Sequence, residues 1–264
     1  MFDAMVNGHI NTSDINFNIT IKDIEVLNRM ALQCIPDLVK ISYATYPLIK
    51  KDYQLLTSGG AIGFGNGPLL VSKNRINLQE LRNYTIAVPG EHTTANLLLS
   101  ALFTDGFSTK PALFSDIEEM VLNNKVDAGV LIHETRFTYE NKGLIKIADL
   151  GELWEKETGL PIPLGAIAVK RSLPQKIKSH INNLLRESIE YAMSNPDTSK
   201  PFVKKHAKSM NETVCNSHIN LFVNRFSVNL GEQGKKAVTT LFERSVKITG
   251  KHTSESLPVF IETV

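Results

Sequence analysis

The sequence predicts an α/β protein with two lobes and a ligand cleft between them, and three observations lead to this prediction. Short apolar runs alternate with segments of helical periodicity through the first two thirds of the chain. Two apolar strands, at 68–72 and 165–169, bracket a middle block of the same α/β pattern. Residues 174–250 have helical periodicity without strands, so these helices must cover a sheet that earlier residues form.

This order of segments is expected when a chain crosses from one lobe to the other and returns. We interpret 68–72 and 165–169 as the crossings, with residues 1–70 and 172–264 in a discontinuous lobe 1 and residues 71–171 in lobe 2. The type II periplasmic-binding-protein fold has this form. Ligands of such open sheets bind at the carboxyl ends of strands, so the cleft is the expected site.

Local periodicity predicts the individual elements. Strands are expected at 16–21, 39–42, 68–72, 84–88, 128–132 and 165–169, where apolar residues alternate with polar ones or run together. Helices are expected after Asp23 and at 46–56, 93–103 and 117–122. The alternation of strands with helices favours a parallel sheet.

Composition excludes several classes of protein. The 29 basic and 27 acidic residues are spread along the chain, so no charged patch predicts nucleic-acid or membrane binding. Cys34 and Cys215 lack the spacing of a disulfide framework or a zinc site, and we expect no metal. The N-terminus lacks a secretory signal, and no stretch reaches the ~18 apolar residues that span a bilayer. We therefore expect a cytoplasmic protein, whose oligomeric state the sequence does not reveal.

The segment from Val88 to Ala95 is a candidate anion site. An apolar strand ends in a turn at Gly90, and Thr93 and Thr94 open the helix that follows. Unpaired N–H groups and the helix dipole favour a carboxylate or phosphate there, and threonine hydroxyls can add hydrogen bonds. The alternative is that Thr93 or Thr94 only caps its helix.

His133 directly follows the buried strand 128–132, where side chains enter a cleft. Histidine has an ordinary pKa of ~6.5, so the ring is mostly free base at neutral pH and can accept a proton. A hydrogen-bonded structural histidine is the alternative. Arg136, three residues on, suits a substrate carboxylate or a structural acid equally well.

Three further features have weaker interpretations. Lys40 and Ser42 share one face of a strand and can bind an anion together, although a surface lysine and a capping serine are the alternative. The glycine-rich loop 59–67 is not followed by Gly-Lys-Ser/Thr, so a tight turn is preferred to a phosphate loop. The remaining histidines have no ligand spacing and are interpreted as surface or capping residues: His9, His92, His180, His206, His218 and His252.

Several segments match one family in order along the chain. They are Lys40-Ile-Ser-Tyr-Ala44, Ser58-Gly-Gly-Ala-Ile-Gly63, Gly67-Pro-Leu69, Val88-Pro-Gly90 with His92-Thr-Thr-Ala95, and Ile132-His-Glu-Thr-Arg-Phe-Thr-Tyr139. Together they resemble 1,4-dihydroxy-6-naphthoate synthase of the futalosine route to menaquinone. The resemblance implies the two-lobed fold and a carbon–carbon lyase that uses no metal or organic cofactor. Its reaction would convert cyclic dehypoxanthinylfutalosine, a small anionic molecule, to 1,4-dihydroxy-6-naphthoate and dihydroxyacetone.

The resemblance also implies the roles of individual residues. The histidine of the His-Glu-Thr-Arg motif is the family's proton acceptor, which falls on His133. The positions that correspond to substrate contacts, or lie beside them, are Lys40, Ile41, Ser42, Thr93, Thr94, Ala95 and Arg136.

The chain departs from the family at its start. Family members begin with a strand and a Ser-Pro-Cys-Pro-Asn-Asp-Thr-Phe-like segment, whereas this chain starts at Met1-Phe2-Asp3-Ala4, just after it. We expect either that Met1 is an internal start or that the protein is a shortened form without that strand and its cleft-lining loop. Two rival functions remain on the same fold: the chorismate dehydratase of the same route, and an anion-binding protein without catalysis.

Overall fold

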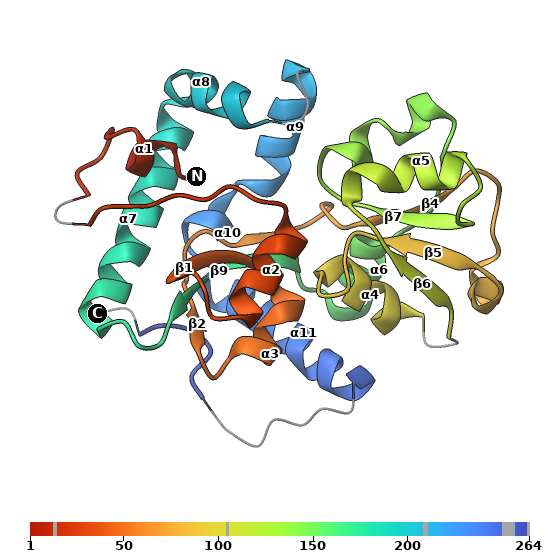
Figure 1. Ribbon diagram of the computed structural model, residues 1–264, viewed down its shortest axis with the longest axis horizontal. Helices are drawn as coiled ribbons and strands as arrows, with labels where there is room; N and C mark the ends of the chain where they lie inside the picture. Colours follow the sequence, from red (N-terminus) through yellow and green to blue (C-terminus); the bar gives the residue numbers. More distant parts are fainter. Residues whose placement is uncertain (13–14, 104–105, 208–210, 250–256, 263–264) are drawn as a thin grey trace.

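The computed structural model describes residues 1–12, 15–103, 106–207, 211–249 and 257–262. It has the two lobes that the sequence predicts (Figure 1). Lobe 1 contains sheet A, which consists of β1, β2, β3 and β9, and lobe 2 contains sheet B, which consists of β4 to β8. The predicted α/β class is therefore confirmed.

Sheet A is built around β9 (Ile162–Lys170), a mostly apolar strand at its centre. β1 (Leu38–Ser42) pairs along one edge of β9, and β2 (Tyr53–Leu55) and β3 (Ala61–Gly63) pair along the other. All three are antiparallel to β9, so the predicted parallel arrangement is wrong for this sheet. The reason is that β9 enters the sheet from the other lobe, without the crossover within one sheet that parallel neighbours require.

Sheet B has the strand order β6-β5-β7-β4-β8. Its strands are β4 (Leu69–Ser72), β5 (Thr85–Val88), β6 (Ser108–Pro111), β7 (Ala128–Leu131) and β8 (Ile145–Asp149). β5 is parallel to β6 and β7, and the helices α4 (Thr94–Leu102) and α5 (Ile117–Leu122) connect these strands. The parallel prediction therefore holds for these three strands, whereas β4 is antiparallel to both of its neighbours.

Lobe 1 carries most of the helices. They are α1 (Asp3–Val6), α2 (Ile24–Leu32), α3 (Tyr46–Ile49), α7 (Gln175–Ser194), α8 (Pro196–His206), α9 (Glu212–Phe222), α10 (Arg225–Val228) and α11 (Gly231–Thr249). The helical prediction for 174–250 is confirmed for the described residues as far as Thr249, whereas residues 208–210 and Gly250 lie outside them. No helix within the described ranges is long and apolar enough to cross a membrane.

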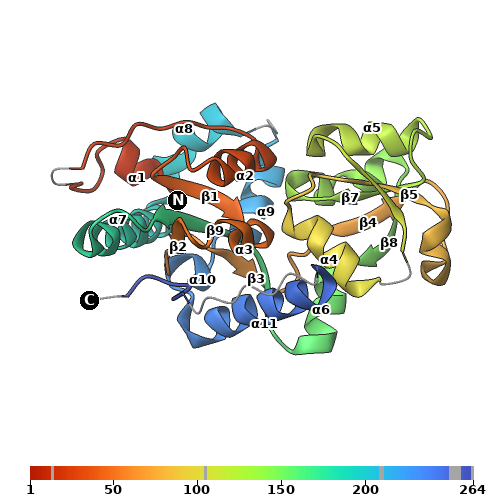
Figure 2. The ribbon, with the colours of Figure 1, turned by 60° about the horizontal axis from the view of Figure 1, so that its bottom comes forward.

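The two faces of β9 contact different helices because its side chains alternate. Ile167 and Val169 pack with α7 in one apolar cluster. Ala166 and Ala168 belong to a second cluster that includes α11 and extends into lobe 2. Figure 2 shows α11 running across the molecule from sheet A toward α4 and α6. The C-terminal helices thus cover sheet A, as the sequence predicts.

Two local predictions are wrong. Residues 16–21, predicted as a strand, form no regular element, and Ile19 and Ile21 are exposed. Alternation alone cannot supply the neighbouring strand that a strand needs for its hydrogen bonds. Residues 46–56, predicted as one helix, form α3 and β2 on either side of a turn. The hydrogen bonds of β2 to β9 outweigh the local helical pattern there.

The lobe boundaries also differ from those predicted. The chain crosses first through residues 64–68 and then through α6 (Leu150–Thr158) with the loop that follows it. β4 lies wholly in sheet B and β9 wholly in sheet A, so neither strand is itself a crossing. Strand pairing therefore assigns residues 69–70 to lobe 2 and 162–170 to lobe 1. An apolar run predicts a buried strand but not the sheet that the strand joins.

The two crossings touch at Gly67. A β-carbon on Gly67 would lie 2.2 Å from the nitrogen and 2.3 Å from the Cα of Gly151, which is in α6. The two backbones are therefore in direct contact, and only glycine fits at position 67. This contact explains one glycine of the 59–67 loop and supports the tight-turn interpretation.

We expect Gly67→Ala to lower the free energy of unfolding by about 3 kcal/mol, because the added methyl group meets backbone that cannot rotate away. Gly65→Ala is the matched control. Gly65 has a φ of 67° and open space around an added β-carbon, so only about 1 kcal/mol of backbone strain is expected. Urea denaturation of both variants measures the difference, and equal losses would contradict the proposed contact.

Candidate active site

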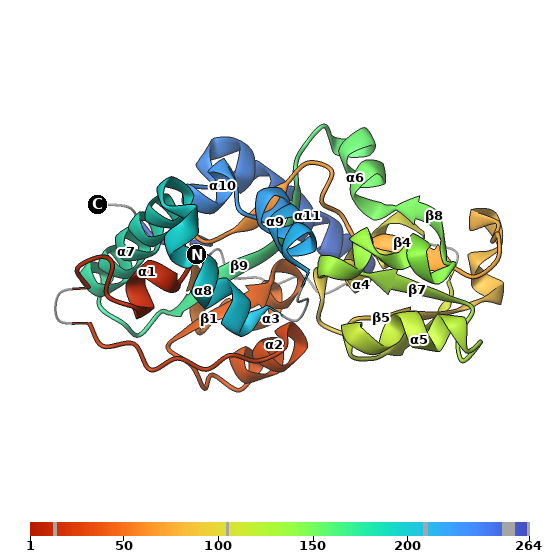
Figure 3. The ribbon, with the colours of Figure 1, turned by 90° about the horizontal axis from the view of Figure 1, so that it is seen from above.

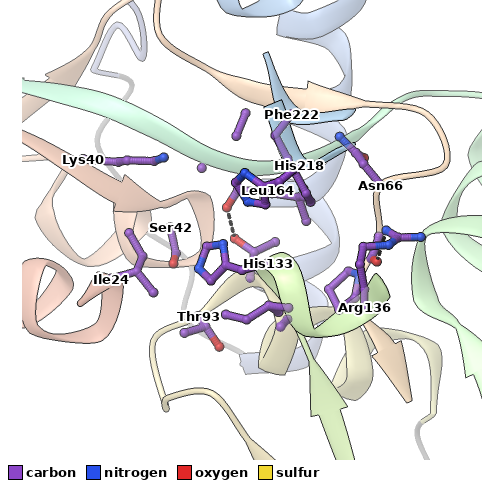
Figure 4. Close-up of a pocket in the computed structure, with 17 residues that line it drawn as sticks. Ile24, Lys40, Ser42, Asn66, Thr93, His133, Arg136, Leu164, His218 and Phe222 are labelled. Atoms are coloured by element: carbon purple, nitrogen blue, oxygen red, sulfur yellow. Dashed lines mark hydrogen bonds between the residues drawn. The ribbon is translucent and has the colours of Figure 1, made fainter. Parts of the chain in front are cut away.

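A cavity of about 100 Å³ lies where the two lobes meet (Figure 4). Its walls come from β1, β9 and α9 of lobe 1, from the first crossing, and from the start of α4 and the segment after β7 of lobe 2. Figure 3 shows α9 at the boundary between the lobes. The predicted site residues that line the cavity are Lys40, Ser42, Thr93, Thr94, Ala95, His133 and Arg136.

Ile41 is the exception among the predicted residues. Its side chain is completely buried in the apolar core and does not line the cavity. Lys40 and Ser42 flank it on β1, and strand alternation turns their side chains to the opposite face. The contiguous stretch that the resemblance implied therefore contains two cavity residues and one core residue.

His133 begins the short 3₁₀ helix η4 (His133–Phe137), two residues after β7 ends at Leu131. Its φ is 58°, in the left-handed region that residues other than glycine seldom adopt. Its ring packs edge-on against Phe114, with the centroids 5.0 Å apart. Backbone strain of this kind persists only where surrounding structure enforces it, and it is concentrated at functional sites.

Lys40 brings a positive charge to the cavity. Its side chain extends from β1 toward the centre of the space (Figure 4). Among the described residues, no hydrogen bond or ion pair to its ammonium group is found, and burial lowers the pKa of Lys40 below its ordinary value. A half-buried cation without a partner among the described residues is costly, so this position favours an anionic ligand.

Ser42 is held by the fully buried side chain of Asn28, on α2. The Asn28 amide donates to the Ser42 hydroxyl at 3.1 Å, and the backbone N–H of Ser42 donates to the Asn28 carbonyl oxygen at 2.8 Å. These two bonds fix the Ser42 side chain at the cavity wall. The predicted pair of Lys40 and Ser42 therefore lies together, as strand periodicity indicates.

Thr93 is the N-cap of α4, so the capping alternative is correct for this residue. Its hydroxyl donates to the Gly90 carbonyl at 2.8 Å and accepts from the backbone N–H of Asn96 at 3.3 Å. Gly90 adopts a φ of 142°, and a β-carbon there would lie 2.6 Å from a carboxylate oxygen of Glu25. The glycine turn thus lets lobe 2 approach α2 of lobe 1 closely.

Thr94 joins the two lobes instead of capping the helix. Its hydroxyl donates to the Leu164 carbonyl of β9 at 2.8 Å and accepts from the backbone N–H of Ala44 at 3.3 Å. The neighbouring His92 carbonyl accepts from Thr45 at 3.0 Å, also across the lobe boundary. These bonds close the cleft at the start of α4, which leaves the helix dipole as that turn's contribution to anion binding.

Arg136 lies at the edge of the cavity but is engaged by the protein itself. Its guanidinium donates to the Gly67 carbonyl at 2.7 Å and pairs with Asp149 at 3.3 Å. The Asp149 carboxylate is nearly inaccessible, and it also accepts from the backbone N–H groups of Gly151 and Glu152 at the start of α6. Arg136 therefore links the two crossings, which is the structural alternative for this residue.

His218 and Asn66 are cavity residues that sequence reasoning missed. The His218 ring lies 5.9 Å from that of His133, and its Nε2 atom is buried without a hydrogen-bond partner among the described residues. Both side-chain polar atoms of Asn66 are also buried without a hydrogen-bond partner among the described residues. The interpretation of His218 as a surface or capping residue is wrong. No local signal reveals it, because α9 reaches the cavity only through tertiary packing.

The other described histidines lie outside this cavity. His9, His92, His180 and His206 do not line this cavity, and His252 lies outside the described residues. Within the described part of the chain, no group of three or more His, Cys, Asp or Glu side chains is arranged to hold a metal ion.

Two lobes with a cavity between them define the class of periplasmic-binding-protein-like folds. The ligand-binding component of an ABC-type import system from Staphylococcus aureus, solved with zinc bound, superposes with a TM-score of 0.66. It is 12% identical, and the match covers 92% of this chain and 84% of that one, so it shows the fold alone. A crystal structure of an Archaeoglobus fulgidus protein superposes with a TM-score of 0.88 at 34% identity, covering 94% and 92% of the two chains.

Residues 1–247 match a family model described as menaquinone biosynthesis. The 1,4-dihydroxy-6-naphthoate synthase of Thermus thermophilus is 39% identical over 261 residues, which are 99% of this chain and 94% of that protein. The synthase of Streptomyces coelicolor is 41% identical over 250 residues, 93% and 88% of the two chains. The chain belongs to this family, and the resemblance that its motifs indicated is confirmed.

We expect Arg136→Met to lower the free energy of unfolding by about 3 kcal/mol, because Asp149 then keeps a buried charge without its cation. Adding Asp149→Asn should restore part of this loss, since the charge is removed while the amide oxygen still accepts at α6. Urea denaturation of the single and double variants measures both effects. A single variant as stable as the wild type would contradict the ion pair.

The pKa of His218 is lowered to about 4, first by burial and then by the charge of Lys40. Below pH 6.5 the unfolded chain therefore binds a proton at this residue that the folded chain does not, and folding stability falls as pH falls. His218→Gln removes this site. Between pH 7 and pH 5 we expect the variant to lose less unfolding free energy than the wild type, by on the order of 2 kcal/mol. Identical pH profiles in denaturant titrations would contradict the lowered pKa.

Proposed function

We propose that this protein is a lyase that converts cyclic dehypoxanthinylfutalosine to 1,4-dihydroxy-6-naphthoate and dihydroxyacetone in menaquinone biosynthesis, with His133 as the proton acceptor. The proposal places the enzyme in the cytoplasm. One observation carries it: His133 of lobe 2 and Lys40 and Ser42 of lobe 1 line the same cavity between the lobes. The two curated relatives are named for this synthase, and neither is named a dehydratase or a binding protein.

Recognition of the substrate would depend on its negative charge. The Lys40 ammonium and the positive end of the α4 dipole both attract an anion, and Ser42 offers a fixed hydroxyl at the same cavity. Arg136 is engaged by Gly67 and Asp149, so we assign it to the crossings and not to a substrate carboxylate. Hydrogen bonds from Asn28 to Ser42 and from Arg136 to Gly67 hold the cavity walls in fixed positions. Fixed walls reduce the entropy cost of orienting the substrate.

In the proposed chemistry, the His133 imidazole takes a proton from the bound substrate. The carbon–carbon bond to the three-carbon unit then breaks, its electron pair stays with the naphthoate fragment, and His133 returns the proton to that fragment. Formation of the aromatic naphthoate ring makes the step favourable. A general base placed in this way contributes ~10²- to 10⁴-fold to the rate. The strained backbone of His133 and its edge contact with Phe114 restrict where its ring can lie.

Opening of the cleft would admit the substrate. The cavity volume of about 100 Å³ is below the roughly 300 Å³ of the smallest ordinary ligand pockets, but His133 and His218 also line a second cavity of about 340 Å³, which adds to the space beside these residues. The hydrogen bonds of Thr94 and of the His92 carbonyl cross the lobe boundary, so opening would break them and closing would form them again. Closure in this manner excludes water from the reacting groups.

His133→Asn tests the base directly, because asparagine tolerates the left-handed backbone of this position but cannot take the proton. We expect kcat to fall ~10²- to 10⁴-fold while the product still binds, measured by mass spectrometry of dihydroxynaphthoate and by calorimetry. His180→Asn, on α7 outside the cavity lining, is the control and should keep full activity.

Three results would contradict the proposal in different ways. Wild-type kcat in His133→Asn would exclude this histidine as the base. Turnover of chorismate by the wild-type protein, without turnover of the futalosine derivative, would instead make it the dehydratase. Binding without turnover of either compound would make it an anion-binding protein.

A further inference from the structure

His218 lies across the cavity from His133 and has no assigned role. It projects from α9 of lobe 1, whereas His133 projects from η4 of lobe 2, and the ring planes are inclined by 47°. Figure 4 shows both rings facing the same space. The Nε2 atom of His218 is buried, and no hydrogen-bond partner for it is found among the described residues. Leaving a buried polar nitrogen unpaired costs ~1–3 kcal/mol, so a ligand that pairs with it would recover this free energy.

The protein holds the His218 ring in a defined position. Phe222, one turn further along α9, packs against it with the ring centroids 4.6 Å apart and also lines the cavity. The helix begins at a cap, where the Asn211 side chain accepts from the backbone N–H of Val214 at 3.1 Å. His218 is therefore a preorganised polar group, which is the form that catalytic hydrogen-bond donors take.

The charge state of His218 suits hydrogen bonding and not proton donation. Burial and the nearby Lys40 hold its pKa at about 4, so the imidazole is neutral at pH 7. A neutral imidazole has one N–H donor and one acceptor nitrogen. It can therefore bind a substrate oxygen without adding a second positive charge beside Lys40.

We propose that His218 is a second catalytic residue, whose Nε2–H donates a hydrogen bond to the substrate oxygen that gains negative charge as the carbon–carbon bond breaks. The proton released in this step passes to His133, and none passes to or from His218. The inference rests on the proposed function, because it takes His133 as the base. A metal bridge between the two rings is not supported, since no third ligand accompanies them within the described part of the chain.

The test compares variants that keep or remove the polar nitrogen. His218→Phe keeps an aromatic ring against Phe222 but cannot donate, and we expect kcat to fall ~10²- to 10³-fold, the loss seen when one such donor is removed. His218→Gln keeps an amide donor and should retain kcat within ~10-fold of the wild type. His180→Phe, outside the cavity, should behave like the wild type.

Two measurements separate the outcomes. Product affinity and thermal unfolding of His218→Phe should stay close to those of the wild type, because a transition-state interaction is lost and not the fold. Wild-type kcat in His218→Phe, or equal loss in the Phe and Gln variants, would overturn the inference. If His218→Phe does not fold, His218→Met takes its place, because methionine matches glutamine in length but cannot donate. The kcat of His218→Met must then be lower than that of His218→Gln.

His133→Asn, assayed alongside, distinguishes the two proposals. If it is inactive while His218→Phe keeps wild-type kcat, only the role of His218 is wrong. If it keeps wild-type kcat, the proposed function is wrong whatever the His218 variants do.

Discussion

The direct contact of the two chain crossings at Gly67 and Gly151 is the constraint on which the site depends. Arg136 binds the Gly67 carbonyl and pairs with Asp149, which begins α6, so one guanidinium fastens both crossings. The same short helix η4 carries His133 at its first residue. The position of the proposed base is therefore linked to the junction between the lobes, and any shift of the crossings would also move the imidazole.

The electrostatics of the cavity follow from burial. Lys40 is the charged residue of β1, and no partner for its ammonium group is found among the described residues. Burial and the nearby Lys40 charge together keep His218 neutral. The cavity thus combines three complementary groups. Lys40 attracts an anion, the neutral His218 ring can donate a hydrogen bond, and His133 on the facing lobe is the proposed base. In such a low-dielectric space each of these interactions is stronger than it would be in water.

Hydrogen bonding explains why the start of α4 serves closure as well as binding. The hydroxyl of Thr93 caps the helix, and that of Thr94 reaches across to β9, so neither is left for a ligand. Asn28 plays the corresponding part in lobe 1, because it orients Ser42 and also donates to the His92 carbonyl. Polar groups that look like a binding motif in the sequence are thus largely used to join the lobes.

The sequence by itself determined the local elements and the polar residues at their ends. Strands such as β5 and β7 and helices such as α2 and α4 follow from apolar periodicity and caps, which depend on neighbouring residues only. His133 was predicted for the same reason, since it directly follows a buried apolar run. The family, too, was indicated by short motifs in order along the chain, and the comparisons confirm it.

Tertiary structure alone decided which of those residues meet. The antiparallel pairing of β9, the partner of Arg136 and the arrival of His218 opposite His133 all join residues far apart in the chain. Such contacts depend on how whole elements pack and which sheet each strand joins, and local periodicity carries no information on either. Sequence periodicity predicted that Lys40 and Ser42 share a face, but only the folded chain shows that Lys40 lies near a neutral histidine and has no ion-pair partner in the described part of the chain.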